Sequence, residues 1–414
     1  MQARGLPNCG LKLRRVVGAI ALCLGASAFA GDANEYGIRY EFKPMPEGVT
    51  RVASWREFDA SLSARQTKFT YATPDAAFVK VFFDYVDLPD GWVLEVANPD
   101  GSESYRYGGK QPADRTVDAD MGHNGSTSFA AMSIEGGKAV VRLIAPSPSG
   151  VPQLTGARPA QPVVKISHVL EGFPEDLKVP LADAGLLESG PTPQSICGSD
   201  QKRPVLCYTG TKPLRAKAVA RLLIGGGGSC TAWRVGSGNR FMTNNHCFST
   251  SSAVAASEVQ FNYQTTTCTG STTAPVTKVA GSSLLRTSST LDYSLFTVAS
   301  TASLSTFGFL SLDVRIPTTG ETIYIPQHPG GRRKELAIDS TSDSGGKCKI
   351  QTANTGVNST YLCDTEPGSS GSPVLATASD KVINLHHLGG CDNAGVRVSR
   401  IWPEIASFFN NVVP

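Results

Sequence analysis

Cysteine is absent from residues 31 to 196, although the 414-residue chain contains ten cysteines. Two of them, Cys9 and Cys23, lie near the N-terminus, and the other eight lie between residues 197 and 391. An even number of clustered cysteines in an exported chain favours disulfides, and their spacings match no zinc-ligand pattern. The cysteine boundary therefore divides the chain into a cysteine-free region and a cysteine-bearing domain.

Neither sign of charge predominates, because the net charge is only +3 and charged residues make up 18% of the chain. This balance argues against nucleic acid or an anionic membrane as partner. Apart from His246, which lies beside Cys247, the histidines show no clustering with acidic residues or cysteines that would indicate a metal site, so we expect neither metal nor cofactor. A hydrophobic content of 40% can bury a core, and the length favours two folded domains.

Long hydrophobic runs are missing, and the apolar run near the N-terminus, Val16 to Leu24, is too short to span a membrane. It follows Arg14-Arg15 and precedes the small residues of Ala28-Phe29-Ala30. This pattern predicts a signal peptide at residues 1–30, cleaved near Ala30. The mature chain is then secreted, extracellular or periplasmic, with no stable membrane association.

Residues 31–180 have the pattern of a small all-β domain. Strand-like runs occupy residues 78–83, 92–96 and 139–144, and Pro-Asp-Gly turn signals separate the first two and follow the second. Residues 181–196 read as a linker. In residues 197–414, strand candidates recur at the short spacing of a barrel or sandwich: residues 218–224, 241–243, 259–263, 293–298, 322–325, 374–375 and 382–385. An amphipathic stretch at 401–409 predicts a C-terminal helix.

Three segments of this domain carry catalytic residue types. His246 ends a strand beside Cys247, and a neutral imidazole is a usable general base near neutral pH. Asp292 opens an apolar run, where its carboxylate can accept a hydrogen bond from the imidazole Nδ1. Each residue alone is also typical of a structural role.

The third segment is the glycine-rich turn Gly368-Ser369-Ser370-Gly371-Ser372-Pro373. Such a turn can project Ser370 outward and aim the N–H groups of Gly368 and Ser370 at a developing oxyanion. The order His, Asp, Ser matches the chymotrypsin-like template rather than the subtilisin or α/β-hydrolase orders. We therefore predict a triad of His246, Asp292 and Ser370 in a monomeric endopeptidase that hydrolyses proteins or peptides through an acyl-enzyme.

These residues resemble those of trypsin-like serine peptidases, and of the bacterial lysyl endopeptidases in particular. The resemblance covers roughly residues 197–403 and rests on residues 365–373, on Asn262-Tyr263-Gln264 followed by Cys268, and on Leu385-His386 followed by Gly389-Gly390. It implies an all-β fold, in which a chymotrypsin-like double β-barrel peptidase domain at 197–414 is preceded by a small all-β N-terminal domain. That first domain resembles the pro-regions of such enzymes only in placement and size.

The resemblance also implies disulfides. It pairs Cys230 with Cys247, Cys207 with Cys268, and Cys197 with Cys391. This leaves Cys348 and Cys363, which we expect to form an extra bridge across a hairpin. The hairpin leads into residues 365–373, the nucleophile loop.

Two acids compete for the primary specificity pocket. Asp364 lies six residues before Ser370, at the spacing of the trypsin pocket acid, and Asp392 lies near the position that lysyl endopeptidases use. A buried carboxylate there would select Lys or Arg. Both candidates stay open, as do the alternatives of a structural residue for Asp364 and a solvated turn residue for Asp392. His386 and Gly389 lie on the expected substrate-binding strand, where His386 approaches the catalytic imidazole, shapes the pocket or packs structurally.

Two departures from the family pattern affect activation. Zymogens that activate through a new N-terminus need an Asp directly before the nucleophile, where this chain has Ser369. Lysyl endopeptidases cut themselves after a Lys close to the first cysteine, but neither Lys nor Arg lies between Lys178 and Cys197. The first domain is then an inhibitor, a folding aid or a permanent module.

Alternative functions are a catalytically silent binding protein on a protease scaffold and a protease of non-basic specificity that its first domain targets.

Overall fold

The computed structural model describes residues 49–109, 113–147, 160–175, 196–225 and 227–414. The signal peptide at 1–30, its cleavage near Ala30, Lys178 and almost all of the linker at 181–196 lie outside the described residues. Where the structure is described, strands dominate and helices are short. No helix of the described segments combines the length and the apolar character needed to cross a membrane.

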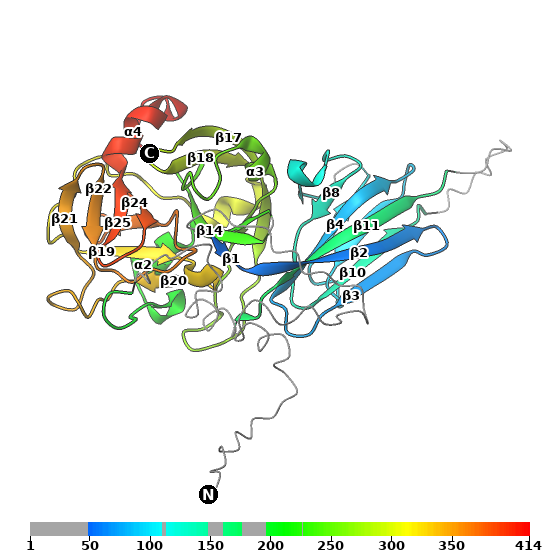
Figure 1. The fold of residues 1–414 in the computed structure, drawn as a ribbon, viewed down its shortest axis with the longest axis horizontal. Helices are drawn as coiled ribbons and strands as arrows, with labels where there is room; N and C mark the ends of the chain where they lie inside the picture. The colour runs from blue at the N-terminus through cyan, green and yellow to red at the C-terminus, as the bar shows by residue number, and fades with distance from the viewer. Residues whose placement is uncertain (1–48, 110–112, 148–159, 176–195, 226) are drawn as a thin grey trace, which may run out of the picture. The chain divides into compact units, whose positions relative to one another are not determined.

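The N-terminal strands form two antiparallel sheets (Figure 1). The first sheet contains β2 (Ala53–Ser63), β11 (Val163–Gly172), β4 (Phe78–Asp87), β8 (Phe129–Ala131) and β7 (Arg115–Thr116), and β9 (Ile134–Glu135) pairs with β4. The second contains β3 (Lys68–Ala72), β10 (Lys138–Ile144), β5 (Val93–Ala97) and β6 (Ser104–Tyr107). Inward-facing residues of both sheets share one buried cluster, which includes Val81, Phe83, Val96 and Val141. The sheets thus pack as a sandwich, with strands at the three runs expected from the sequence.

Six of the following strands close into a barrel. Their order is β14 (Gly228–Arg234), β13 (Val219–Ile224), β16 (Glu258–Phe261), β17 (Thr277–Ser288), β18 (Tyr293–Val298) and β15 (Phe241–Thr243). The barrel closes because β15 pairs with β14 as well, with Met242 opposite Trp233. The two-residue strand β1 (Thr50–Arg51) pairs with the start of β14, on the same edge whose far end pairs with β15. A strand from the cysteine-free region therefore extends the sheet of this barrel.

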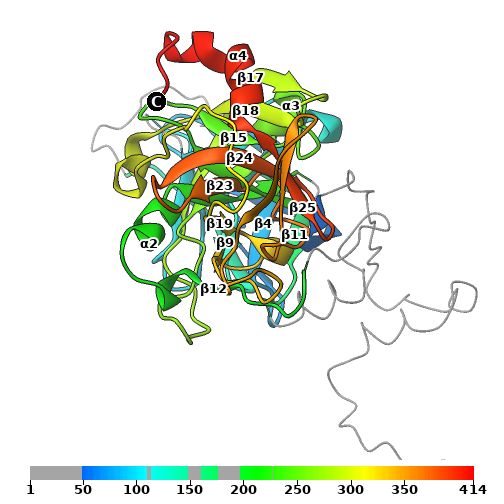
Figure 2. The same cartoon turned by 90° about the vertical axis from the view of Figure 1, so that its left-hand side faces the viewer.

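The C-terminal strands form a second, curled sheet of eight. Its order is β12 (Arg203–Pro204), β20 (Glu335–Ala337), β19 (Ile323–Gln327), β23 (Pro373–Ala376), β24 (Lys381–Leu388), β25 (Asn393–Arg397), β22 (Asn358–Tyr361) and β21 (Ile350–Thr355). A bridge between Thr322 and Lys349 brings the starts of β19 and β21 together, so the sheet forms a half-barrel. Figure 2 shows β23, β24 and β25 side by side, with helix α4 (Val398–Ile405) at their end. A 3-10 turn, η6 (Ala406–Phe409), completes the helical segment expected at 401–409.

Short helical turns connect these strands. They are η2 (Ala119–Met121), η3 (Val205–Cys207), α2 (Thr211–Ala216), α3 (Ser251–Ala255), η4 (Ala302–Phe307) and η5 (Pro329–Gly331). One buried cluster joins the barrel, the half-barrel and the C-terminal helix, because it contains Trp233, Leu295, Leu385 and Ile401. The expectation of an all-β, chymotrypsin-like double barrel is confirmed, and the loops at the junction of its two halves are held by a common core.

Three disulfides join the residues that the family resemblance implies: Cys197–Cys391, Cys207–Cys268 and Cys230–Cys247. The expected fourth bridge is absent from the structure, where Cys348 and Cys363 are buried free thiols. The Cys348 Sγ instead donates to the carbonyl of Asp339 at 3.6 Å. Burial, followed by the neighbouring Cys348, raises the pKa of the Cys363 thiol well above its usual value, which disfavours the reactive thiolate.

A buried polar cluster connects the N-terminal sandwich to the barrel. Glu258 of β16 is fully buried and forms an ion pair with Lys80 of β4. Its other oxygen accepts from Ser133 Oγ at 2.7 Å and Gln260 Nε2 at 2.8 Å. Lys278 of β17 donates to the carbonyl of Ser133 at 2.7 Å. These contacts tie the cysteine-free region to the barrel through satisfied charges rather than through apolar surface alone.

Candidate active site

His246 and Asp292 form a hydrogen-bonded pair. The imidazole Nδ1 lies 2.7 Å from Asp292 Oδ2, and the backbone N–H of His246 donates to Asp292 Oδ1 at 3.0 Å. Asn244 donates to the backbone carbonyl of Asp292 at 2.8 Å, so the loop after β15 and the start of β18 are locked together. The Nε2 of His246 is buried, and no group of the described residues hydrogen-bonds to it. The ring thus has its Nδ1 fixed and its Nε2 available to accept a proton.

Asp292 has a second histidine partner, His387 of β24. Its Nδ1 lies 3.1 Å from Asp292 Oδ2, and its Nε2 lies 3.1 Å from Asn358 Oδ1. Burial opposes ionisation of Asp292, but the hydrogen bonds from His246 and His387 outweigh it and hold the pKa of this carboxyl well below its usual value. Asp292 is therefore a carboxylate over the whole physiological pH range.

The segment around Ser370 is shaped by two glycines in the left-handed region, Gly368 with φ +90° and Gly371 with φ +86°. A Cβ on Gly371 would lie 2.2 Å from the carbonyl oxygen of Thr231, so no other residue fits there without displacement. Thr231 donates its N–H to the Ser370 carbonyl at 2.8 Å and its hydroxyl to the Gly368 carbonyl at 2.9 Å. Strand β14 therefore holds the nucleophile loop through the backbone carbonyls of Gly368 and Ser370.

The same strand connects this loop to the histidine. Thr231 follows Cys230, whose disulfide partner Cys247 follows His246. The Sγ of Cys247 lies 4.0 Å from the Ser370 carbonyl oxygen. The structure thus brings the segments that carry His246, Asp292 and Ser370 together. One possible metal-ligand atom from each of Cys230, His246 and Cys247 lies within 4.8 Å of the other two. Both sulfurs belong to the disulfide, however, and cannot act as thiolate ligands.

His386 takes a structural position, whereas its neighbour His387 contacts Asp292. The His386 ring is buried, and its Nδ1 lies 2.7 Å from the hydroxyl of Tyr361. Burial, with smaller contributions from His387 and His246, lowers the pKa of His386 to about 3, so this ring stays neutral. Successive strand residues face opposite sides, so His387 contacts Asp292 while His386 contacts Tyr361. The sequence contained the adjacent pair but gave no means of choosing between them.

Asp364 does not have the geometry of a pocket acid. Its side chain is fully buried, and its two oxygens accept from the backbone N–H groups of Cys197 at 3.0 Å and Gln201 at 2.8 Å. Burial raises the pKa of Asp364. Both oxygens are thus engaged by the segment that begins at Cys197, which gives Asp364 the structural role that the sequence left open.

Asp392 is exposed and accepts from the Thr360 hydroxyl at 3.0 Å. Gly389 is exposed as well, at the end of β24. Asn393, the residue after Asp392, is buried. Its side chain donates to the Cys363 carbonyl at 2.7 Å and accepts from Thr365 Oγ1 at 3.0 Å. This side chain fixes the strand that follows Asp392 against the segment that enters the nucleophile loop. Of the two candidate acids, Asp392 is exposed and Asp364 is buried.

The strand β1 also lies beside the nucleophile loop. Thr50 pairs with Ser229, the residue before Cys230, and Thr50 is fully buried. A Cβ on Gly368 would lie 2.9 Å from the Thr50 Cγ2. Val49 belongs to the same buried cluster as Cys230 and Cys247. This part of the cysteine-free region therefore covers the edge of β14 next to the nucleophile loop.

Comparison with known proteins agrees with the barrel geometry. A family described as the lysyl endopeptidase C-terminal domain matches residues 205–396. Secreted RxLR effector protein 73 of Plasmopara viticola is 29% identical over 355 residues, which cover 81% of this chain and 81% of that protein. The family match and the double barrel together give the chain a trypsin-like serine protease fold.

Two solved structures also match part of this chain. A Glu endopeptidase is 19% identical, covers 52% of this chain and 100% of its own, and superimposes with a TM-score of 0.39. The active form of the Rv3671c protease from M. tuberculosis is 13% identical, covers 52% of this chain and 91% of its own, and gives a TM-score of 0.36. Both matches span about half of this chain.

Proposed function

We propose that this chain is a secreted serine endopeptidase that hydrolyses peptide bonds through an acyl-enzyme on Ser370. The observation that carries the proposal is the His246–Asp292 pair, fixed at 2.7 Å beside a nucleophile loop with two left-handed glycines. An ionised, partly buried Asp292 and an imidazole whose Nε2 has no hydrogen-bond partner among the described residues support general-base catalysis. The three disulfides are typical of an exported protein.

In the proposed reaction, the Ser370 hydroxyl attacks the substrate carbonyl while His246 Nε2 takes its proton. Asp292 keeps the imidazole oriented and stabilises the imidazolium. The N–H groups of Gly368 and Ser370 stabilise the oxyanion. His246 then donates the proton to the leaving amine, and water hydrolyses the acyl-enzyme by the same steps. His387 also orients Asp292, through the same Oδ2 that His246 contacts.

A cleavage profile of the full chain on a peptide library tests this proposal, with Ser370→Ala as the matched control. We expect cleavage by the parent protein and a loss of several orders of magnitude in kcat for the variant, with an unchanged melting temperature. Equal rates for the two proteins would contradict the assignment.

We further propose that cleavage follows Lys or Arg and that Asp392 supplies the selecting charge. The family match to lysyl endopeptidases supports basic specificity, and the backbone contacts of Asp364 leave Asp392 as the accessible acid. Asp392→Asn should lower kcat/KM for Lys and Arg substrates up to about fivefold, since an ion pair with an exposed carboxylate contributes up to about 1 kcal/mol. A parent profile without any basic preference would reject this specificity.

For the cysteine-free region, we propose a zymogen-like role in which β1 restricts the substrate cleft. This proposal is supported by the pairing of Thr50 with Ser229, two residues before the Thr231 that holds Ser370, and by the complete burial of Thr50. Because β14 is engaged by β1, a substrate strand cannot form the same ladder.

Disruption of β1 provides the test of this role. Thr50→Pro should raise the rate for long peptides more than the rate for a peptide with a small chromogenic leaving group, because only the former extends along β14. An unchanged ratio of the two rates would argue that β1 is a permanent structural element instead.

A catalytically silent binding protein is the second candidate, because a relative carries the name of a secreted effector. Fold alone does not guarantee activity. The two functions differ in whether Ser370 reacts with a serine-directed phosphonate, since a silent scaffold would bind partners without forming a covalent adduct.

A further inference from the structure

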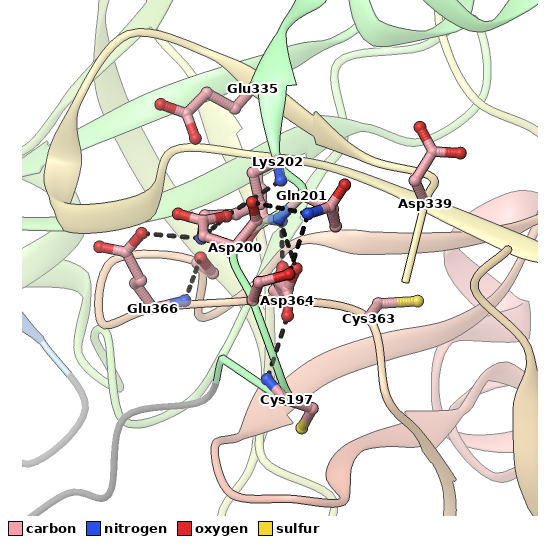
Figure 3. Close-up of polar contacts among 12 residues, drawn as sticks. Cys197, Asp200, Gln201, Lys202, Glu335, Asp339, Cys363, Asp364 and Glu366 are labelled. Carbon is pink, nitrogen blue, oxygen red and sulfur yellow. Dashed lines mark hydrogen bonds and ion pairs between the residues drawn. The ribbon is translucent and has the colours of Figure 1, made fainter. Parts of the chain in front are cut away.

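The loop that precedes Ser370 is anchored by a partly buried cluster of charges around Glu366 (Figure 3). The guanidinium of Arg332 donates to both Glu366 oxygens, at 2.7 and 2.8 Å. The ammonium of Lys202 lies 2.9 Å from Glu366 Oε1, and the Lys202 side chain has no exposed surface. Asp200 Oδ1 is a second partner of Lys202, at 2.8 Å. Glu366 therefore receives two cations inside the protein.

Glu366 is connected directly to the turn that presents the nucleophile. The N–H of Ser369 donates to the Glu366 carbonyl at 2.9 Å, and the Glu366 N–H donates to Ser369 Oγ at 3.2 Å. The Ser372 hydroxyl donates to the Ser369 carbonyl at 2.5 Å. Gly368 and Ser370, which flank Ser369, carry the N–H groups assigned to the oxyanion. Displacement of Glu366 would thus move these donors.

Lys202 is itself held in place from the N-terminal side. The Cys197–Cys391 disulfide fixes the start of its segment, and the two Asp364 oxygens bind the N–H groups of Cys197 and Gln201 (Figure 3). The Asp200 carboxylate also accepts from the Lys202 N–H at 3.0 Å. This explains Asp364, which connects the Lys202 segment to the nucleophile loop two residues before Glu366.

We infer that Lys202, acting on Glu366 together with Arg332, is a positioning residue for the nucleophile loop. It keeps the N–H groups of Gly368 and Ser370 aimed at the oxyanion without a newly formed N-terminus. The inference rests on the proposed function. In zymogens that activate by cleavage, the freed amine pairs with an Asp in the place of Ser369. Here the acid stands three residues earlier, at Glu366, and the cation is an internal side chain.

The electrostatics keep this cluster charged. Burial opposes ionisation of Glu366, but Arg332 and then Lys202 outweigh it and lower its pKa to about 2. Burial likewise opposes the charge on Lys202, but Glu366 and then Asp200 raise its pKa above the usual value. An α-amine titrates near pH 8, so the internal lysine supplies a cation over a wider alkaline range than a freed N-terminus would.

Lys202→Met and Glu366→Gln in the full chain test the inference, with Lys347→Met at an exposed ion pair as the matched control. Both variants should lower kcat about 10²-fold, the effect of losing an oxyanion donor, with little change in KM. The double variant should be no worse than Glu366→Gln alone, because Glu366→Gln already removes the Lys202–Glu366 ion pair. Lys202→Arg, which keeps the charge, should restore most of the lost rate.

Hydrogen exchange provides a readout that does not depend on turnover. The amides of residues 366–372 should exchange faster in both variants than in the parent protein, while those of the first barrel stay protected. If Lys202→Met does not fold, Glu366→Gln decides alone, since it preserves shape. Folded variants with parental kcat and parental loop exchange would overturn the inference even if the parent is an active peptidase. A parent without turnover would reject the proposed function, and unchanged loop exchange would then reject this inference separately.

Discussion

Glu258 is the buried charge on which the junction between sandwich and barrel most depends. Both of its oxygens are satisfied, by Lys80, Ser133 and Gln260. Glu258→Gln keeps the shape and one acceptor, but it leaves the Lys80 ammonium, 4% exposed, without its counter-ion. Removing one partner of a buried pair costs about 3–5 kcal/mol, whereas replacing both partners is far less costly. We therefore expect Glu258→Gln to lower the free energy of unfolding by about 3 kcal/mol or more.

The assay is urea denaturation of the Ser370→Ala chain at pH 7, which avoids self-digestion. Adding Lys80→Met to Glu258→Gln should recover about 2 kcal/mol, since it removes the unpaired charge. Lys347→Ala, at an exposed pair, should cost no more than about 1 kcal/mol. A Glu258→Gln cost below that of Lys347→Ala, or a double variant worse than Glu258→Gln, would refute the reasoning.

The same group predicts acid sensitivity. Burial alone would raise the pKa of Glu258, but Lys80 and Lys278 outweigh it and lower the value from 4.5 to about 2. A carboxyl whose pKa is depressed by folding contributes stability above its unfolded pKa and loses that contribution as the pH falls. The contribution, about 3 kcal/mol from 1.36 kcal/mol per pKa unit, should disappear between about pH 4.5 and 2 in the parent and be absent in Glu258→Gln.

Two further substitutions test the site. Gly371→Ala should cost at least about 2 kcal/mol in unfolding free energy and abolish turnover, because φ is +86° and the new Cβ would meet Thr231; Gly356→Ala, which has a positive φ but open space, should cost less and keep full activity. His387→Ala should lower kcat about tenfold with KM unchanged, since it removes one hydrogen bond to an ionised Asp292; a parental kcat would show that His387 does not orient Asp292.

Local patterns in the sequence were sufficient to predict the segments that carry the candidate site. The strand runs, the C-terminal helix and the segments of His246, Asp292 and Ser370 follow from periodicity, turn residues and motif order. The structure brings these three segments together around β14. Short-range physics determines such features, because a tight turn or a strand end is encoded by neighbouring residues.

The features that sequence reasoning missed all depend on contacts between distant segments. Asp364 binds the segment of Cys197, 167 positions away along the chain. The choice of His387 over His386 depends on which face of β24 meets Asp292, a residue far away along the chain. The Lys202–Glu366 pair joins residues whose sequence neighbourhoods show no relation. Asp364 and the adjacent residues His386 and His387 were visible in the sequence, but their partners could be identified only from the tertiary fold.

The cysteines illustrate the same limit from the other side. Family resemblance implied three pairs that the structure contains, whereas the fourth pair was inferred from the two cysteines that remained. Being left over does not establish bonding, because a disulfide requires matched Cβ positions as well as proximity.

The most direct test of the central claim is covalent labelling of the full chain with a peptidyl-lysine phosphonate, followed by mass spectrometry of the adduct. The account predicts one adduct, on Ser370, with stoichiometric loss of peptidase activity and no labelling of the Ser370→Ala variant. An unlabelled parent protein that binds peptides, or an adduct on a residue other than Ser370, would contradict it.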